Sequence, residues 1–143
     1  MKKRAGMVMK GFKEMRAALD ALPTDLTVAA HAIVGSHAYA AATQILAGYA
    51  AHEDTGALTD GLTVEEIHAS GRFLAIARVV NRAPHAYIFE LGTVARYTKS
   101  GAYRGVMPPG NIFYPITDRE RDAMYDDIAA LLVDFGLTVQ RAA

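Results

Sequence analysis

The stretch 85-HAYIFELGT-93 decides how the second half of the chain is organised. Aromatic and aliphatic side chains run directly into a carboxylate, Glu90, and then into Gly92. If residues 86–91 form one or two helical turns, Gly92 is the left-handed residue that ends them. Glu90 can then accept hydrogen bonds or pair with a cation, for which Arg82 or an arginine further along the chain is within reach. The sequence therefore predicts that Glu90 anchors the base of the segment that follows.

Downstream of this stretch lies a long segment, residues 94–111, that is rich in Gly and Pro. It carries Arg96, Lys99 and Arg104 between tyrosines, and it contains no acid. A loop of this length inside a compact domain is usually functional or mobile. It could contact phosphates, as Arg and Tyr do on nucleic acids, or it could face solvent or a protein partner. The neutral net charge of the chain favours a loop that faces solvent or a partner.

The chain then closes with a well-marked helix. A capping box over residues 117–120 predicts its start, acids crowd its first turn, and Gly136 predicts its end. Residues 137–139 could add a short final strand. The helix is acidic whereas the 94–111 segment is basic, so we expect the basic segment to meet the acids of another copy.

Two helices are predicted in the first part of the chain. Residues 7–22 show helical spacing of apolar side chains. Thr24 or Asp25 then caps a long helix that runs to about Ala51, with Gly56 as its natural stop. After its first turn this helix carries no formal charge, and it is long enough to span a bilayer. Because it is rich in Ala and contains several polar residues, a helix packed closely against protein is favoured over a membrane span.

Two runs in the middle of the chain, 62–68 and 72–80, predict a hairpin that turns at residues 70–71. Thr63 and Glu66 have the spacing of a capping box, so a short helix is the alternative for the first run. Together the elements predict an α+β fold with two N-terminal helices, a small antiparallel β-sheet with a long loop, and a C-terminal helix packed on the sheet.

Length and composition limit the class of protein. The 143 residues are enough for one domain, residues 1–143, of which residues 1–6 are expected to form a flexible tail. Fifteen Lys and Arg balance fifteen Asp and Glu, which argues against a dedicated nucleic-acid binder. There is no Cys, so disulfides, zinc–thiolate sites and Cys nucleophiles are excluded. The basic start is followed by no apolar stretch, so we expect a protein that is made and used inside a cell, or is assembled there into something larger.

The histidines are the candidates for catalysis or metal binding. His31 and His37 lie about 120° apart around one helix and do not share a metal. His52 and the two acids after it could bind a metal, but a solvated polar turn is favoured. His85 and Glu90 could form an acid–base pair, yet no third group, phosphate loop or nucleophile elbow accompanies them. We therefore expect no enzyme, no catalytic residue, no cofactor and no metal.

Four features of the chain, taken in order, resemble one known family. They are 54-DTGAL-58, the predicted hairpin, 83-APHAYIFELGT-93 with the Gly-rich loop after it, and 113-FYP-115 before the last helix. This order is similar to that of the head–tail joining, or tail-completion, proteins of long-tailed double-stranded DNA bacteriophages. The resemblance covers roughly residues 29–139.

The resemblance implies a structural protein of the virion neck or tail, present in the host cytoplasm during assembly. Its copies would form a ring, with a hexamer expected and a dodecamer as the other expectation. Partners would be neighbouring head–tail connector or tail-tube proteins and DNA that passes through without sequence-specific binding, and no membrane. The motif residues that would anchor the loop are Asp54, Thr55, Gly56, Leu58, His85, Tyr87, Glu90, Gly92 and Thr93. Subunit or ring contacts are expected from Arg96, Tyr97, Lys99, Tyr103 and Arg104.

Two other functions stay open at this point. A small nucleic-acid-binding module that uses residues 96–104 would show a salt-dependent affinity for duplex DNA. A small hydrolase built around His85 and Glu90 would lose its turnover when Glu90 is replaced.

Overall fold

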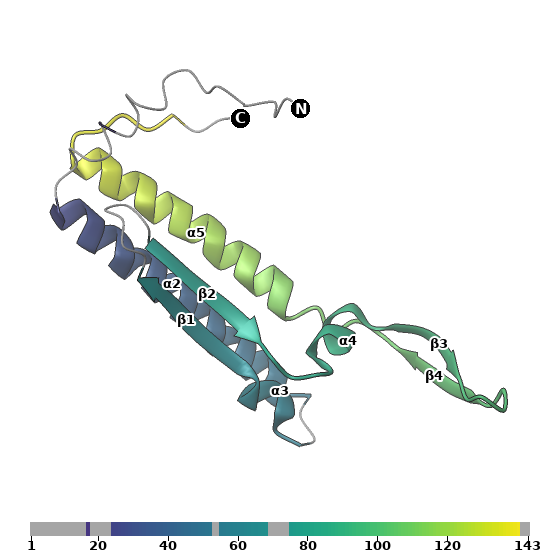
Figure 1. The fold of residues 1–143 in the computed structure, drawn as a ribbon. Helices are drawn as coiled ribbons and strands as arrows, with labels where there is room; N and C mark the ends of the chain where they lie inside the picture. The colour runs from purple at the N-terminus through teal and green to yellow at the C-terminus, as the bar shows by residue number, and fades with distance from the viewer. Residues whose placement is uncertain (1–16, 18–23, 53–54, 69–74, 141–143) are drawn as a thin grey trace, which may run out of the picture.

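The computed structural model describes residues 17, 24–52, 55–68 and 75–140. The helix predicted over 7–22 lies outside the described residues apart from residue 17, and so do Asp54 and the turn predicted at 70–71. The described chain has the predicted α+β fold, with two long helices, two short helices and two separate antiparallel sheets of two strands each (Figure 1).

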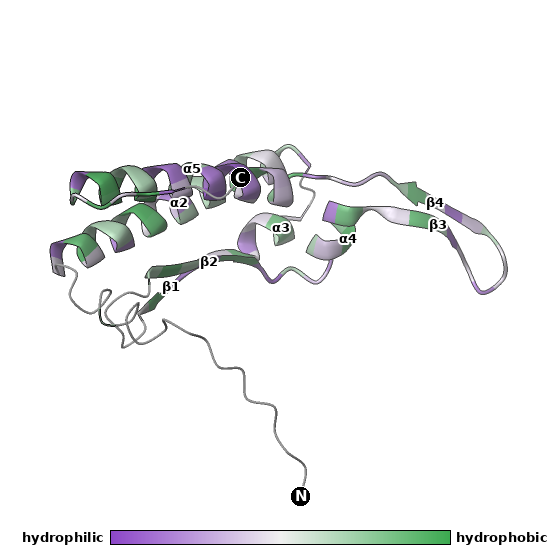
Figure 2. Ribbon diagram, turned by 90° about the horizontal axis from the view of Figure 1, so that it is seen from above, coloured by the Kyte–Doolittle hydropathy of each residue, from purple (hydrophilic) through white to green (hydrophobic). Residues whose placement is uncertain are grey.

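Helix α2 (Thr24–Ala50) is the central element of the body, by which we mean everything except the second sheet. It packs against the sheet of β1 (Leu62–His68) and β2 (Ala75–Asn81) and against α5 (Phe113–Asp134). Helix α5 also faces β2 across a cavity, so the C-terminal helix lies over the sheet as predicted (Figures 1 and 2). The prediction of a long helix is confirmed, whereas close packing on most sides is not, because five residues of α2 are buried and Val28 and Tyr39 are exposed. No helix in the described part of the chain is long and apolar enough to cross a membrane.

Strands β1 and β2 form the hairpin that the sequence predicted. They pair antiparallel in unbroken register, from Leu62 opposite Asn81 to His68 opposite Ala75. Partly buried and exposed residues alternate over the first part of β2, as expected for a sheet with one face on a helix. The alternative of a short helix for the first run is therefore wrong, because a matching partner run supplies the ladder of hydrogen bonds.

Two short helices, α3 (Ala57–Asp60) and α4 (Ala86–Leu91), close one end of the body. The long helix ends at Ala50, and Gly56, with φ 79°, starts α3 instead of stopping α2 as predicted. Helix α4 has the predicted extent, and Gly92 ends it with a positive φ of 71°. Its ψ of −172° belongs to a region open essentially to glycine alone, and not to the left-handed helical region that was predicted.

Strands β3 (Thr93–Tyr97) and β4 (Tyr103–Met107) form an arm, residues 93–107, that projects from the body (Figures 1 and 2). The prediction of an irregular loop over residues 94–111 is therefore wrong. Tyr and Val favour strands, and Gly101, with φ 84°, allows the tight turn between them. Two register shifts interrupt the ladder, as β-bulges do, and such bulges increase the twist of a ribbon.

Helix α5 starts at Phe113, which is four residues before the predicted capping box, so that part of the prediction is wrong. The Thr117 hydroxyl donates to the carbonyl oxygens of Phe113 and Tyr114, at 2.9 and 3.0 Å, as a threonine does inside a helix. Gly136, with φ 79°, follows the end of the helix as predicted. Residues 137–140 are irregular and pair with none of the described strands, so the predicted final strand over 137–139 is absent.

The core of the described chain is small. Seven hydrophobic residues and Glu90 are buried, and the main cluster, Ile45, Tyr49, Leu58 and Ala86, lies where the end of α2 meets the short helices. No described residue of α5 is buried. Many large apolar side chains are exposed instead, and Figure 2 shows apolar residues in the arm as well as in the body. The fold therefore leaves apolar surface that another chain can cover.

Candidate functional site

Glu90, near the end of α4, is buried beside the start of α5. Its Oε2 accepts a hydrogen bond from the Ile112 amide at 2.9 Å, and its Oε1 accepts one from the Phe113 amide at 3.0 Å. The Tyr49 hydroxyl donates to Oε1 at 2.9 Å. Because the first amides of a helix have no partner within it, this carboxylate caps α5 from a distant part of the sequence. Its position at the positive end of the helix dipole adds to the stabilisation.

Of the two alternatives predicted for Glu90, hydrogen bonds or a cation, the structure shows the hydrogen bonds. Arg82 instead bonds to Glu65 and to the Thr63 hydroxyl on β1, and its guanidinium holds the pKa of the Glu65 carboxyl below its ordinary value. The arginines of the arm are exposed. Helix α4 places residue 90 where backbone donors converge, and a carboxylate there needs no cation.

The same junction closes the base of the arm. The Gly110 amide donates to the Phe89 carbonyl oxygen at 2.7 Å, and the Met107 amide donates to the Thr93 hydroxyl at 3.0 Å. A Cβ atom at Gly92 would lie 2.6 Å from the Met107 carbonyl oxygen, which leaves room for glycine alone. Gly92 and Thr93 thus hold the two strands together where they leave the body.

Tyr49 links this junction to the core, and the sequence did not single it out. Its ring is fully buried and meets the Phe89 ring edge-on, with centroids 5.7 Å apart. Burial and the hydrogen bond to Glu90 raise the pKa of Tyr49 well above its ordinary value, so the hydroxyl keeps the proton that it donates. A pocket of about 180 Å³ opens beside Tyr49 and Glu90. No hydrogen bond in the described chain joins the side chains of His85 and Glu90.

The two motifs at residues 54–58 and 85–93 meet in the core. Leu58 of the first and Ala86 of the second belong to one buried cluster. Thr55 and His85 are exposed, and Tyr87 is 69% exposed. The described motif residues therefore divide into those that build the junction and those that face solvent.

The five residues expected to make subunit or ring contacts all lie on the arm. Tyr97 opposes Tyr103 across the strands, with ring centroids 5.5 Å apart. Arg96, Lys99 and Arg104 are exposed, and no ion pair within the described chain involves them. The arm contains no acid. It therefore presents a basic and aromatic surface that forms no ion pair with the described part of its own subunit.

A polar clamp between α2 and α5 was not found from the sequence. Nδ1 of His37 lies 2.9 Å from a Glu120 oxygen, and Nε2 lies 2.9 Å from an Asp127 oxygen. A carboxylate only accepts, so both contacts are hydrogen bonds when the ring is protonated. The hydrogen bonds to Asp127 and Glu120 raise the pKa of His37, and His37 lowers the pKa of Glu120. The acids are seven residues apart on one helix, but only the packing of the helices shows which residue faces them.

The other histidines belong to no group of metal ligands among the described residues. His52 packs its ring against Phe89, with centroids 5.7 Å apart, at the end of α2. The two acids that follow His52 lie outside the described residues. Within the part of the chain that the structure describes, no three His, Asp or Glu side chains are grouped to hold a metal.

Comparisons with known proteins give this chain no relative. No protein family, no curated protein and no solved structure matches it. The family resemblance noted in the sequence stays a prediction.

Proposed function

We propose that this chain is a structural protein of a long-tailed double-stranded DNA bacteriophage. Its copies form a ring at the head–tail connector, the neck or the top of the tail, and the ring is a conduit for DNA during ejection. One observation carries the proposal: a small core with a firmly bonded junction supports an arm whose side chains are mostly exposed.

Exposed apolar side chains on both long helices support assembly. Val28 and Tyr39 on α2 are 64% and 53% exposed, and Tyr125 and Val133 on α5 are 52% and 58% exposed. A protein that works as a monomer rarely leaves many such groups in contiguous patches. Subunits packed side by side would cover them, and contacts between unlike surfaces close into a ring when the rotation permits.

The junction at Glu90 supports a structural role for the motif residues around it. A ring requires that every subunit present its contact segments in the same direction. Because Glu90 ties α4 to the start of α5 where the arm leaves, the root of the arm is fixed while its surface stays accessible. The carboxylate already accepts three hydrogen bonds, so this geometry gives no support to a hydrolase.

The proposed partners are those of a ring at the head–tail connector or tail. They are further copies of the chain, as a hexamer or a dodecamer, and the neighbouring head–tail connector or tail-tube proteins. DNA would pass through a neutral or acidic channel, because firm phosphate contacts would slow its passage. The protein would assemble in the host cytoplasm and remain in the virion at the neck or tail.

The test is the mass and the location of the protein. Light scattering should give a multiple of the 15.4 kDa subunit mass, alone or with the connector and tail-tube proteins of the same phage. Negative-stain images should show rings with a central opening, and antibodies should label the virion at the neck or tail. A protein that stays monomeric with all of these partners and is missing from virions would contradict the proposal.

The arm also favours a second candidate, a nucleic-acid-binding module. A two-stranded β-ribbon fits the major groove of DNA, and this one carries three cations and two tyrosines near its turn. If three phosphates are neutralised, the slope of log affinity against log salt should be about −3. Tight duplex binding with that slope, lost in Arg96→Glu, would favour this candidate over the ring.

A further inference from the structure

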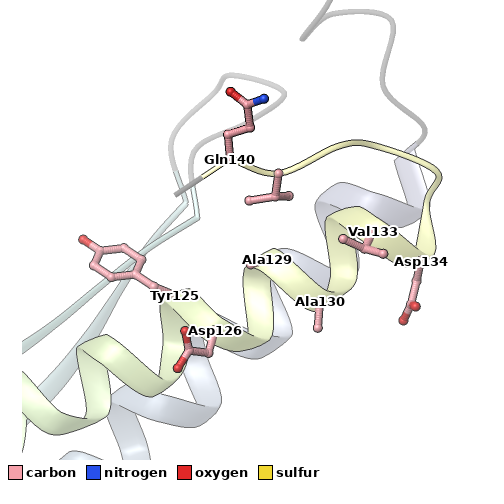
Figure 3. Close-up of a pocket in the computed structure, with 8 residues that line it drawn as sticks. Tyr125, Asp126, Ala129, Ala130, Val133, Asp134 and Gln140 are labelled. Atoms are coloured by element: carbon pink, nitrogen blue, oxygen red, sulfur yellow. The ribbon is translucent and has the colours of Figure 1, made fainter. Parts of the chain in front are cut away.

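A pocket on α5 has a chemistry that complements the arm. It has a volume of about 740 Å³ and lies between the C-terminal half of α5 and residues 137–140 (Figure 3). Ala129 and Ala130 give it a floor of small side chains, and Val133 and Val139 add apolar walls. The pocket is an open groove on the surface of the helix, and its volume leaves room for more than one large side chain.

Acids border the pocket along one ridge of the helix. Asp126 and Asp134 line it, and Asp122 lies one turn earlier on the same ridge. Aspartates stand at four-residue spacing at 118, 122, 126 and 134, and all are exposed. Ala130 takes the one remaining place in this series, so the ridge has a gap at the pocket. Asp118 already pairs with Arg121 at 3.0 Å, and a cation that docks against the pocket is attracted by the acids that border it.

The arm carries the matching groups. Tyr97 and Tyr103 are 63% and 62% exposed, although aromatic rings of this size gain most from an apolar pocket. Arg96 and Arg104 extend from the same two strands and are exposed. Aromatic and arginine side chains together are the typical anchors of protein interfaces.

The arm cannot reach the pocket of its own subunit. It leaves the body beside the first residue of α5, Phe113, whereas the pocket begins at Tyr125. Twelve residues of helix separate the two positions, which is about 18 Å. The arm also points away from α5 in both views (Figures 1 and 2).

We infer that the arm of one copy docks in the α5 pocket of the next copy. Its tyrosines cover Ala129 and Ala130, and its arginines face Asp126 and Asp134. Because arm and pocket lie at opposite ends of the molecule, the contact is head to tail and successive copies form a ring or a filament. This inference deepens the proposed function, and it rests on that function because the partner is a second copy of the chain.

Two double variants disable the arm and the pocket separately. Arg96→Glu with Arg104→Glu disables the arm and leaves the pocket intact. Ala130→Trp with Asp134→Arg fills the pocket, reverses one acid and leaves the arm intact. All four positions are exposed, so both variants should fold, and circular dichroism checks this.

The two variants should complement each other in one way only. Each should be monomeric alone at concentrations where the wild type forms oligomers. Mixed together, they should give a one-to-one dimer of twice the 15.4 kDa subunit mass in sedimentation, because one working arm meets one working pocket. Arg78→Glu with Arg121→Glu is the matched control for the arm variant. It makes the same change of charge at exposed positions outside the arm and pocket, and it should assemble like the wild type.

Other outcomes overturn the contact and can be told from failure of the proposed function. Normal oligomers from either variant alone, a mixture that stays monomeric, or a monomeric wild type would each overturn it. If wild-type rings are nevertheless found in virions, the proposed function stands with a different interface. A one-to-one dimer from the mixture, with the protein missing from virions, keeps the contact and overturns the proposed function.

Discussion

The Glu90 junction and the arm are adjacent in the chain, yet they are held by different forces. At the junction, Glu90 is 5% exposed and Tyr49 is fully buried, and no buried polar side-chain atom of the described chain lacks a partner. On the arm, Val94 is 84% exposed and Tyr97 is 63% exposed. The junction therefore draws its stability from within the subunit, whereas the arm has little of its own core.

The difference shows where the fold ends and the contact surface begins. A two-stranded ribbon by itself is only marginally stable in water, and three or more strands or a covering helix are usually needed. The arm keeps its shape through cross-strand contacts and through the closure at its base. Residues that the subunit does not need for folding are free to be selected for another surface.

The largest loss of stability is expected when Glu90 of the junction is replaced. Glu90→Ala should lower the free energy of unfolding by about 3–5 kcal/mol, because the Ile112 and Phe113 amides and the Tyr49 hydroxyl lose their acceptor. Urea denaturation measures this. Glu90→Gln keeps an acceptor and should cost less, and Tyr49→Phe removes one hydrogen bond and should cost about 1 kcal/mol. An alanine variant as stable as the wild type would show that Glu90 is no anchor.

The next largest effect should come from glycine at the base of the arm. Gly92→Ala should cost about 2–3 kcal/mol, because its Cβ meets the Met107 carbonyl oxygen and its φ is positive. Gly101 is the matched control, since it also has a positive φ but no atom within 4 Å of its Cβ position. Gly101→Ala should therefore cost no more than about 1–2 kcal/mol, and only in the arm. Equal urea midpoints for the two variants would show that the close contact at Gly92 does not limit the side chain there.

The clamp at His37 should make the body mildly sensitive to pH. The folded pKa of His37 is raised above 6.5, so its contribution is complete below that value and is lost as the pH rises through the raised pKa. The folded pKa of Glu120 is lowered below 4.5, so its contribution is present above that value and is lost as the pH falls through the lowered pKa. The clamp is therefore strongest between these two values.

The size of this effect is limited by solvent. The Asp127 side chain is 62% exposed. Arg78 and Arg121 line the pocket beside His37, and their positive charges disfavour the protonated imidazole. We expect a loss on the order of 0.5 kcal/mol between about pH 6 and about pH 9. Urea midpoints across this range measure it, with His37→Gln as the control that should not show it. The same pH dependence in both proteins would exclude the clamp as its source.

The smallest effect on the whole fold should come from the arm itself. Tyr97→Ser with Tyr103→Ser removes the cross-strand ring contact, so amide exchange over residues 93–107 should become faster. The free energy of unfolding of the body should change by less than about 0.5 kcal/mol. A loss as large as that of Glu90→Ala would show that the arm belongs to the folding unit.

Local patterns were enough for the elements whose structure is decided by their own residues. The long helix α2, the β1–β2 hairpin and the short helix over residues 86–91 all have the predicted type and nearly the predicted bounds. The burial and hydrogen bonding of Glu90 also agree with the pattern of an apolar run followed by an acid and a glycine. Each of these depends on spacing within a few turns or on one short hairpin.

The features that were missed depend on distant residues. The start of α5 is fixed by Glu90, which precedes it by more than twenty residues, and not by its own Thr117. The arm was predicted as a loop because Gly101 and Gly105 signal irregular chain, whereas both have a positive φ inside a ribbon. The His37 clamp requires two helices to be packed before its partners can be seen.

The hydrogen bond from the Gly110 amide to the Phe89 carbonyl oxygen bears on how this protein can change over generations. Everything between Gly92 and Gly110 enters and leaves the body at one point, so the body is insensitive to the number of residues in between. Two more residues in each strand would preserve the faces of the ribbon and extend its reach by about 7 Å. The entropy of closing the longer segment grows only slowly. Insertions and deletions there can tune the distance between neighbouring subunits while the core stays as it is.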